Sequence, residues 1–147
     1  MTKIDNAIDV KAAREKVFEY VSNIAAQPEW VKWAKRVEVI NAEPGLVGST
    51  DAMLMQLGPR KVSVEGIITE SREGKFISRR LTRGMDLTER LSLIDAGGGT
   101  KVAWTVEYTP PMGVLGMTID ILFTARLFDQ LMKDSLVNLR ERLEAKG

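Results

Sequence analysis

The chain has 147 residues, the length of one ordinary domain, and 44% of them are hydrophobic and 28% charged, which is typical of a globular protein. Lysine and arginine total 21 against 20 acidic residues, so the net charge of +1 gives no electrostatic basis for binding nucleic acid. The chain contains no histidine and no cysteine. Disulfides, thiolate and imidazole metal ligands and a histidine general base are therefore excluded.

The sequence also gives no sign of a targeting signal, a membrane span or a cofactor. Residues 1–10 lack the apolar core of a signal peptide, and the apolar-rich stretch 112–123 is shorter than the roughly 20 residues of a membrane helix. Gly97–Gly99 has the character of a hairpin turn, without the Lys-Ser/Thr of a phosphate-binding loop. We expect a cytoplasmic protein with no cofactor and no integral membrane segment.

The N-terminal third predicts one strand followed by two short helices. Residues 1–10 alternate between apolar and polar, the pattern of a strand with one covered face. In residues 11–22 the apolar positions recur every three or four residues, which favours a helix. Residues 29–35 are expected to form a second short helix that carries Trp30 and Trp33.

The middle of the chain predicts a meander of six antiparallel strands. Short Gly- or Pro-containing links separate the strand-like segments, so consecutive strands should be neighbours. The expected strands are 37–40, 49–57, 60–69, 75–82, 86–94 and 100–109. We find no internal repeat or linker and expect a single domain over residues 1–147.

A long helix is predicted over residues 112–145, after Pro110 and Pro111. One stripe of this helix is apolar at helical spacing: Val114, Met117, Ile121, Ala125, Phe128, Met132, Leu136, Leu139 and Leu143. Its first half is apolar on the opposite side too, at Leu115, Ile119, Leu122 and Phe123. That side must be covered, either by the chain's own loops, by the contents of a pocket, by a second subunit in a homodimer, or by a membrane surface.

This order of elements, together with four local segments, resembles the START-like superfamily, also called SRPBCC or birch-pollen-allergen-like. The segments are 10–18 (VKAAREKVF), 27–33 (QPEWVKW), 98–104 (GGTKVAW) and 110–116 (PPMGVLG). The nearest branch is the polyketide cyclase/dehydrase-like group, although Lys11–Ala13 depart from its usual Pro or Ser before the first helix. The resemblance implies an α+β helix-grip fold, in which a curved antiparallel sheet of about seven strands and a long C-terminal helix enclose a cavity.

The alternation of side chains along two neighbouring strands predicts one buried charged residue, Glu89. Val102, Trp104, Val106 and Tyr108 share a phase that should face inward, because burying them removes the most apolar surface. The same choice on the neighbouring strand places Glu89 among Leu87, Leu91 and Leu93. A buried carboxylate must be paired, protonated or near water, unless it lies at a strand end or a bulge turns it outward. Arg80, in phase with Phe76 and Ser78, is the expected partner.

The other carboxylates give no sign of a metal site. Asp51, Glu65, Glu70 and Asp86 are expected at strand ends or in outward phases, and nothing in their spacing indicates a metal-binding cluster. Glu89, Tyr108 and Arg80 are therefore the weak candidates for catalysis. The side chains expected to line an apolar cavity are Trp30, Trp33, Met53, Met55, Phe76, Glu89, Leu91, Trp104, Val106, Tyr108, Met117, Ile121 and Phe128, and ordinary core packing explains most of them equally well.

Three functions remain open from the sequence. The first is a binding protein for an apolar or aromatic small molecule such as a lipid, a quinone or a polyketide-like compound. The second is a cyclase- or dehydratase-like enzyme, which would need a carboxylate whose pKa is raised by burial. The third is a protein-interaction or dimerisation module that uses the apolar first half of the last helix.

Overall fold

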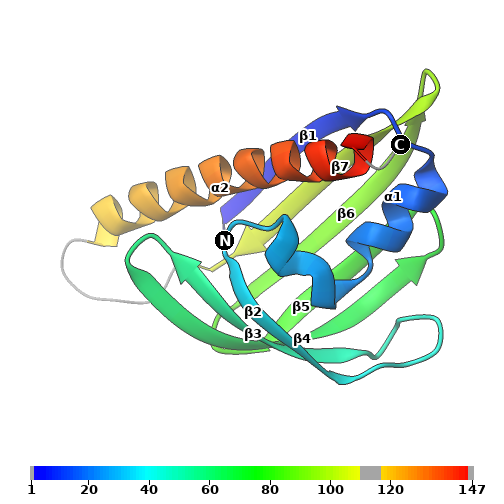
Figure 1. Ribbon diagram of the computed structural model, residues 1–147. Helices are drawn as coiled ribbons and strands as arrows, with labels where there is room; N and C mark the ends of the chain where they lie inside the picture. The colour runs from blue at the N-terminus through cyan, green and yellow to red at the C-terminus, as the bar shows by residue number, and fades with distance from the viewer. Residues whose placement is uncertain (1, 110–116, 146–147) are drawn as a thin grey trace.

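The computed structural model describes residues 2–109 and 117–145, and in the last helix its side chains are described from Phe123 onward. A curved seven-stranded antiparallel sheet wraps around the helices on its concave side, with strand order β1-β7-β6-β5-β4-β3-β2 (Figure 1). The elements are β1 (Thr2–Val10), α1 (Arg14–Val21), η1 (Ile24–Glu29), β2 (Ala34–Asn41), β3 (Thr50–Leu57), β4 (Arg60–Arg72), β5 (Phe76–Arg83), β6 (Leu87–Ala96), β7 (Gly99–Tyr108) and α2 (Met117–Ala145). The predicted helix-grip architecture and the six-stranded meander are confirmed.

The second predicted helix is placed and shaped differently from the sequence expectation. It is a 3₁₀ helix, η1, that ends at Glu29, so Trp30 and Trp33 lie in the turn that leads into β2. The backbone N–H of Trp30 donates to the carbonyl of Gln27, three residues earlier, which is the tighter spacing of a 3₁₀ turn. This turn brings both indole rings under the sheet, where each is at most 2% exposed.

Five aromatic side chains, the aromatic cluster, fill the space between β7, η1 and α2. They are Trp30, Trp33, Trp104, Tyr108 and Phe128, and each is at most 2% exposed. The Trp104 ring packs against Trp30 and Trp33 with centroid distances of 5.4 and 5.1 Å. Phe128 of α2 continues the contact to Trp33 at 5.3 Å and to Tyr108 at 4.7 Å. Such tilted and edge contacts are favourable aromatic geometries, and they link β7 to the described part of α2.

Helix α2 crosses the concave side of the sheet with its apolar stripe inward. Phe128, Met132, Leu136 and Leu139 are at most 2% exposed, as the sequence pattern predicts. Asn6 of β1 donates from Nδ2 to Asp129 Oδ1 at 2.9 Å and fixes the helix to that strand. In the first half of the helix only Phe123 belongs to the predicted dimer surface and to the described side chains, and it is 59% exposed. Leu115 and the side chains of Ile119 and Leu122 lie outside the described residues.

Candidate functional site

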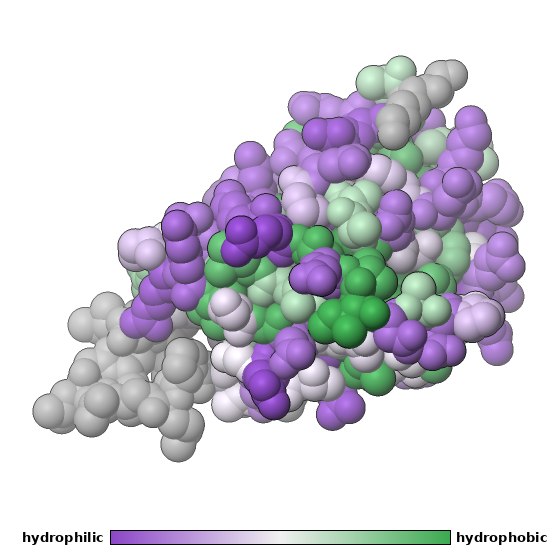
Figure 2. Space-filling model, turned by 60° about the horizontal axis from the view of Figure 1, so that its bottom comes forward, coloured by the Kyte–Doolittle hydropathy of each residue, from purple (hydrophilic) through white to green (hydrophobic). Residues whose placement is uncertain are grey.

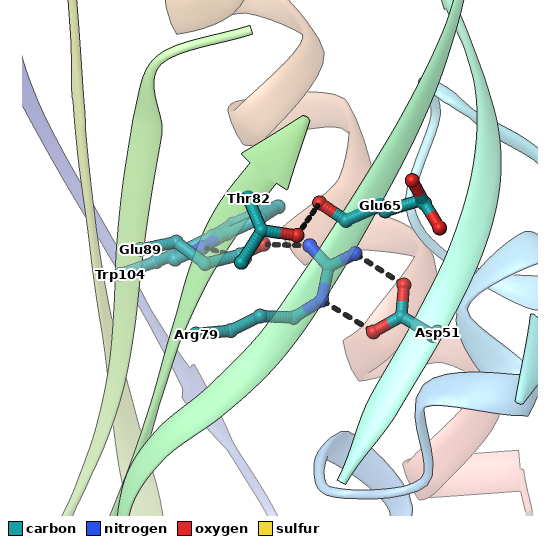
Figure 3. Close-up of polar contacts among 6 residues, drawn as sticks. All are labelled: Asp51, Glu65, Arg79, Thr82, Glu89 and Trp104. Carbon is teal, nitrogen blue, oxygen red and sulfur yellow. Dashed lines mark hydrogen bonds and ion pairs between the residues drawn. The ribbon is translucent and has the colours of Figure 1, made fainter. Parts of the chain in front are cut away.

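A buried ion cluster lies on the concave face of the sheet (Figure 3). Arg79 of β5 is 4% exposed and donates from Nε to Asp51 Oδ2 at 2.9 Å and from Nη2 to Asp51 Oδ1 at 2.5 Å. Its Nη1 donates to Glu89 Oε2 at 3.2 Å. One guanidinium therefore joins two carboxylates on different strands, Asp51 on β3 and Glu89 on β6, and holds both in a fixed geometry.

Gly66 makes this arrangement sterically possible. Strand β4 runs between β3 and β5, and in its register Gly66 pairs with Asp51 on one side and Leu81 on the other. A Cβ atom at Gly66 would lie only 2.6 Å from Arg79 Nη2 and 2.7 Å from Cζ. The guanidinium thus crosses β4 directly over the Gly66 backbone, and any side chain at this position would occupy its place.

Trp104 connects the ion cluster to the aromatic cluster. Its indole Nε1 donates to Glu89 Oε1 at 3.1 Å. Glu89 Oε2 already accepts from Arg79, so both carboxylate oxygens have a buried donor. A fully hydrogen-bonded polar group is the condition under which a buried charge is tolerated, and here it also fixes the Trp104 ring.

The ion cluster carries more negative than positive charge. Two carboxylates face one guanidinium, so the formal sum is −1 when all three groups are ionised. Burial raises the pKa of Glu89 and the Asp51 charge acts in the same direction, whereas Arg79 and the Trp104 N–H oppose the rise. Burial lowers the pKa of Arg79, but hydrogen bonds and attraction from the two carboxylates outweigh it, so that this pKa is raised. Arg79 is therefore charged, and Glu89 holds a proton more readily than an ordinary carboxyl.

A groove of about 300 Å³ opens beside the ion cluster. It lies between the start of η1, the end of β2, the segment that joins β2 to β3, and the floor made by β3 and β4. Its walls are mainly apolar, and its lining is Ser22, Asn23, Ile24, Val39, Ala42, Leu46, Ser49, Thr50, Asp51 and Ile68. Asp51 is the one ionisable residue among these ten. The groove therefore joins an apolar surface to a single charged group.

Apolar side chains also surround this part of the chain on the molecular surface. Val39 and Ile40 of β2 are 41% and 57% exposed, and Val47 in the following segment is 49% exposed. Figure 2 shows a face of the molecule on which hydrophobic side chains gather at the centre and hydrophilic ones surround them. Exposed apolar surface next to a groove is a common property of binding sites.

The structure confirms the predicted burial of Glu89 but gives it a different partner. Glu89 is 7% exposed, whereas Arg80 is exposed and contacts neither carboxylate of the cluster. The phase predicted for β5 is wrong, because Ile77, Arg79 and Leu81 face inward. Phe76 lies on the outer side, where the Arg90 guanidinium stands 3.9 Å from its ring centroid. Burying Ile77 and Leu81 removes two aliphatic side chains from water. Arg79 lies between them in the same strand phase and therefore faces inward too, where it is paired with carboxylates.

Of the two positions expected for Asp51, the strand end is correct and the outward phase is wrong. Asp51 is the second residue of β3, and it is 2% exposed on the inner face of that strand. The signal was present in the sequence, because Asp51 shares a period-two phase with Met53, Met55 and Leu57, all of which are buried. The other groove residues on η1, on β2 and in the segment after it had no motif that could have marked them.

The remaining predicted site residues whose side chains the structure describes are buried. Met53, Met55, Leu91, Trp104, Val106 and Tyr108 are at most 4% exposed, and none of them lines the groove. Trp30, Trp33 and Phe128 belong to the aromatic cluster described above. The side chains of Met117 and Ile121 lie outside the described residues. Among the described residues, no three acidic side chains come together in a way that could hold a metal ion.

Comparison with known proteins identifies the kind of fold. A family model described as "Polyketide cyclase / dehydrase and lipid transport" matches residues 1–144. No curated protein matches the chain. No helix in the described residues has the length and hydropathy needed to cross a bilayer.

Several solved structures share the architecture over nearly the whole chain. One is a protein from Thermus thermophilus, with a TM-score of 0.86 and 17% identity over 99% of each chain. An aromatase/cyclase from a Streptomyces species has a TM-score of 0.84 and 9% identity over 97% of this chain and 93% of its own. A START superfamily protein from Mycobacterium smegmatis has a TM-score of 0.80 and 16% identity over 99% of each chain. Identities this low establish the fold and leave the activity to be argued from the site.

Proposed function

The chain belongs to the polyketide cyclase/dehydrase and lipid transport family, and from this premise we propose that it binds an apolar or aromatic small molecule in the groove beside Asp51. The observation that carries the proposal is the combination of apolar walls with one rigidly held polar group at the floor. Binding pockets for small molecules are typically apolar cavities with a few fixed polar groups that orient the ligand.

The position of the groove differs from the cavity expected from the sequence. The sequence places that cavity between the sheet and the C-terminal helix, where the described part of the helix packs through Phe128 against the aromatic cluster. No residue of α2 lines the groove, which lies between η1 and the β2–β3 part of the sheet. We therefore assign the ligand to the groove and give the aromatic residues a packing role.

Preorganisation is the second support for the proposal. Asp51 is held by two hydrogen bonds from a guanidinium that is itself fixed by Glu89, so its carboxylate loses little freedom when a ligand contacts it. The groove volume of about 300 Å³ lies at the lower end of the range for small-molecule sites. A compact aromatic or short-chain apolar ligand fits these dimensions better than a two-chain lipid.

The proposal is tested with the neutral fluorescent probe N-phenyl-1-naphthylamine. Ala42 lines the groove and is exposed, so Ala42→Trp should fill the space and weaken probe binding by at least about tenfold. Ala7→Trp, at an exposed position on β1, is the matched control and should bind as the wild type does. Absence of binding to the wild-type chain, or equal binding by the Ala42→Trp variant, would refute the proposal.

A cyclase- or dehydratase-like reaction is the second candidate, favoured by the carboxyl chemistry of the cluster. The Asp51 carboxylate lies at the groove floor, where it could accept a proton from a bound substrate, and Arg79, which is held in turn by Glu89, fixes its position. The test is incubation with a linear poly-β-ketone and detection of cyclised product that has lost one water by mass spectrometry. Turnover should disappear in Asp51→Asn if this carboxylate moves the proton, and a wild-type chain without turnover would exclude this reaction for that substrate.

A further inference from the structure

The charge of the ion cluster and the lining of the groove together indicate the chemical class of the ligand. When all three groups are ionised, Asp51 and Glu89 contribute two negative charges and Arg79 one positive charge, and all three side chains are at most 7% exposed. A buried site with an uncompensated charge is costly, because water cannot solvate it. A further positive charge close to the cluster would remove that cost.

The groove is the side from which such a charge can approach. Asp51 is the member of the ion cluster that lines the groove, and none of the other nine lining residues is ionisable. Asn23, Ser49 and Thr50 add oxygen atoms that can accept hydrogen bonds from an ammonium group. The lining supplies no lysine or arginine that could receive an anionic ligand.

We infer that the ligand is an organic cation, an apolar amine whose ammonium group lies against Asp51 while its hydrocarbon part occupies the apolar walls. This inference rests on the proposed function and specifies its ligand. An ammonium has three donors and a full charge, so it satisfies the free acceptor positions of Asp51 and neutralises the cluster. A neutral alcohol of the same size would gain the apolar contacts and one hydrogen bond but no attraction between charges, and a carboxylate would be repelled.

The first experiment compares three probes of equal shape by isothermal titration calorimetry. They are 2-phenylethylamine, which is cationic at neutral pH, 2-phenylethanol, which is neutral, and phenylacetate, which is anionic. We expect the amine to bind at least about tenfold more tightly than the alcohol and the carboxylate to show no binding. Equal affinity for the amine and the alcohol, stronger binding of the carboxylate, or no binding of the amine would overturn the inference.

The second experiment places a cation in the groove by mutation. Val39 of β2 is the direct cross-strand partner of Asp51 and is 41% exposed, so a longer side chain there can reach Asp51 without disturbing the core. Val39→Lys should raise the melting temperature relative to Val39→Gln, because its ammonium compensates the cluster. It should also weaken 2-phenylethylamine binding by about tenfold or more, since the site is already occupied.

Ile94→Lys is the matched control for the added charge. Ile94 is 50% exposed on β6 and does not line the groove, so this variant should neither raise the melting temperature nor change amine binding. If Val39→Lys behaves like Val39→Gln in both measurements, the inferred role of Asp51 is wrong.

Failure of the cationic-ligand inference and failure of the proposed function would give different results. If N-phenyl-1-naphthylamine binds in the groove and the amine shows no advantage over the alcohol, the ligand is apolar but not cationic, and the proposed function survives alone. If Ala42→Trp leaves the binding of every probe unchanged, the groove itself is not the site and both proposals fail.

Discussion

The two halves of the concave face are built on different principles. The half formed by β7 and covered by α2 is filled by aromatic rings at centroid distances of 4.7–5.4 Å. The half formed by β3 to β6 carries a charged cluster, and its β3 end opens to a groove. Apolar packing depends on shape and is insensitive to pH, whereas the charged half depends on protonation and on what occupies the groove. The comparison predicts that both halves contribute to stability, but that only the contribution of the charged half depends on pH and on the ligand.

Arg79→Met should give the largest effect. The change leaves Asp51 and Glu89 buried without a cation, and the expected loss in the free energy of unfolding is about 4 kcal/mol near neutral pH. Without Arg79, which opposes the effect of burial, the Glu89 carboxyl should protonate more readily when folded than unfolded. The loss should therefore shrink as the pH falls toward about 4.5, near the ordinary carboxyl pKa, measured by urea unfolding.

Arg80→Met is the control for this variant, because Arg80 is exposed on the opposite side of β5. It should change the free energy of unfolding by less than about 0.5 kcal/mol. A loss from Arg79→Met that stays constant across this pH range would contradict the charged nature of this half.

Phe128→Leu should give the next largest effect, and it tests the aromatic half. Leucine keeps the side chain apolar but loses the ring contacts with Trp33 and Tyr108, so we expect a loss of about 2 kcal/mol. This loss should be the same in mildly acidic and mildly basic buffer, and the binding of 2-phenylethylamine should not change. Phe123→Leu, at a 59% exposed position of the same helix, should have almost no effect on urea unfolding.

Gly66→Ala tests whether the Arg79 guanidinium needs the space over the Gly66 backbone where it crosses β4. A Cβ atom at this position would displace the guanidinium, and we expect a loss of about 1.5 kcal/mol. In the Arg79→Met background the same change should cost much less, because methionine has no guanidinium at this point and can adjust. Equal costs in both backgrounds, measured as a double-mutant cycle, would show that Gly66 is needed for a different reason.

Sequence reasoning predicted the fold and the apolar half better than the charged half. The α2 stripe from Phe128 onward and the inward phases of β6 and β7 follow from apolar periodicity, because several aliphatic or aromatic residues support each assignment. In β5 one phase has one apolar residue and the other has two, and arginine occurs in both phases. A guanidinium that is paired across three strands cannot be recognised from one strand alone.

The groove could not be predicted from the sequence, for a related reason. Its lining comes from η1, β2, the β2–β3 segment, β3 and β4, and most of it consists of ordinary small or aliphatic residues. The residues of β2, β3 and β4 meet at this place because of the strand register, which puts Val39 opposite Asp51 and Asp51 opposite Gly66. Gly66 lies in phase with Val64 and Ile68 in the sequence, but nothing there indicates that an arginine from β5 lies over it.

The smallest expected effect concerns the protonation of Glu89. Because burial raises its pKa in the folded chain, its contribution to stability is fully present below the ordinary value of 4.5 and is lost as the pH rises through the folded value. Glu89→Gln cannot titrate, so the melting temperature of this variant should fall less between about pH 5 and pH 8 than that of the wild type. Glu38→Gln, at an exposed position of β2, should keep the wild-type slope. Identical slopes for wild type and Glu89→Gln would mean that Glu89 stays ionised in the folded chain over this pH range, and that its partners outweigh the effect of burial.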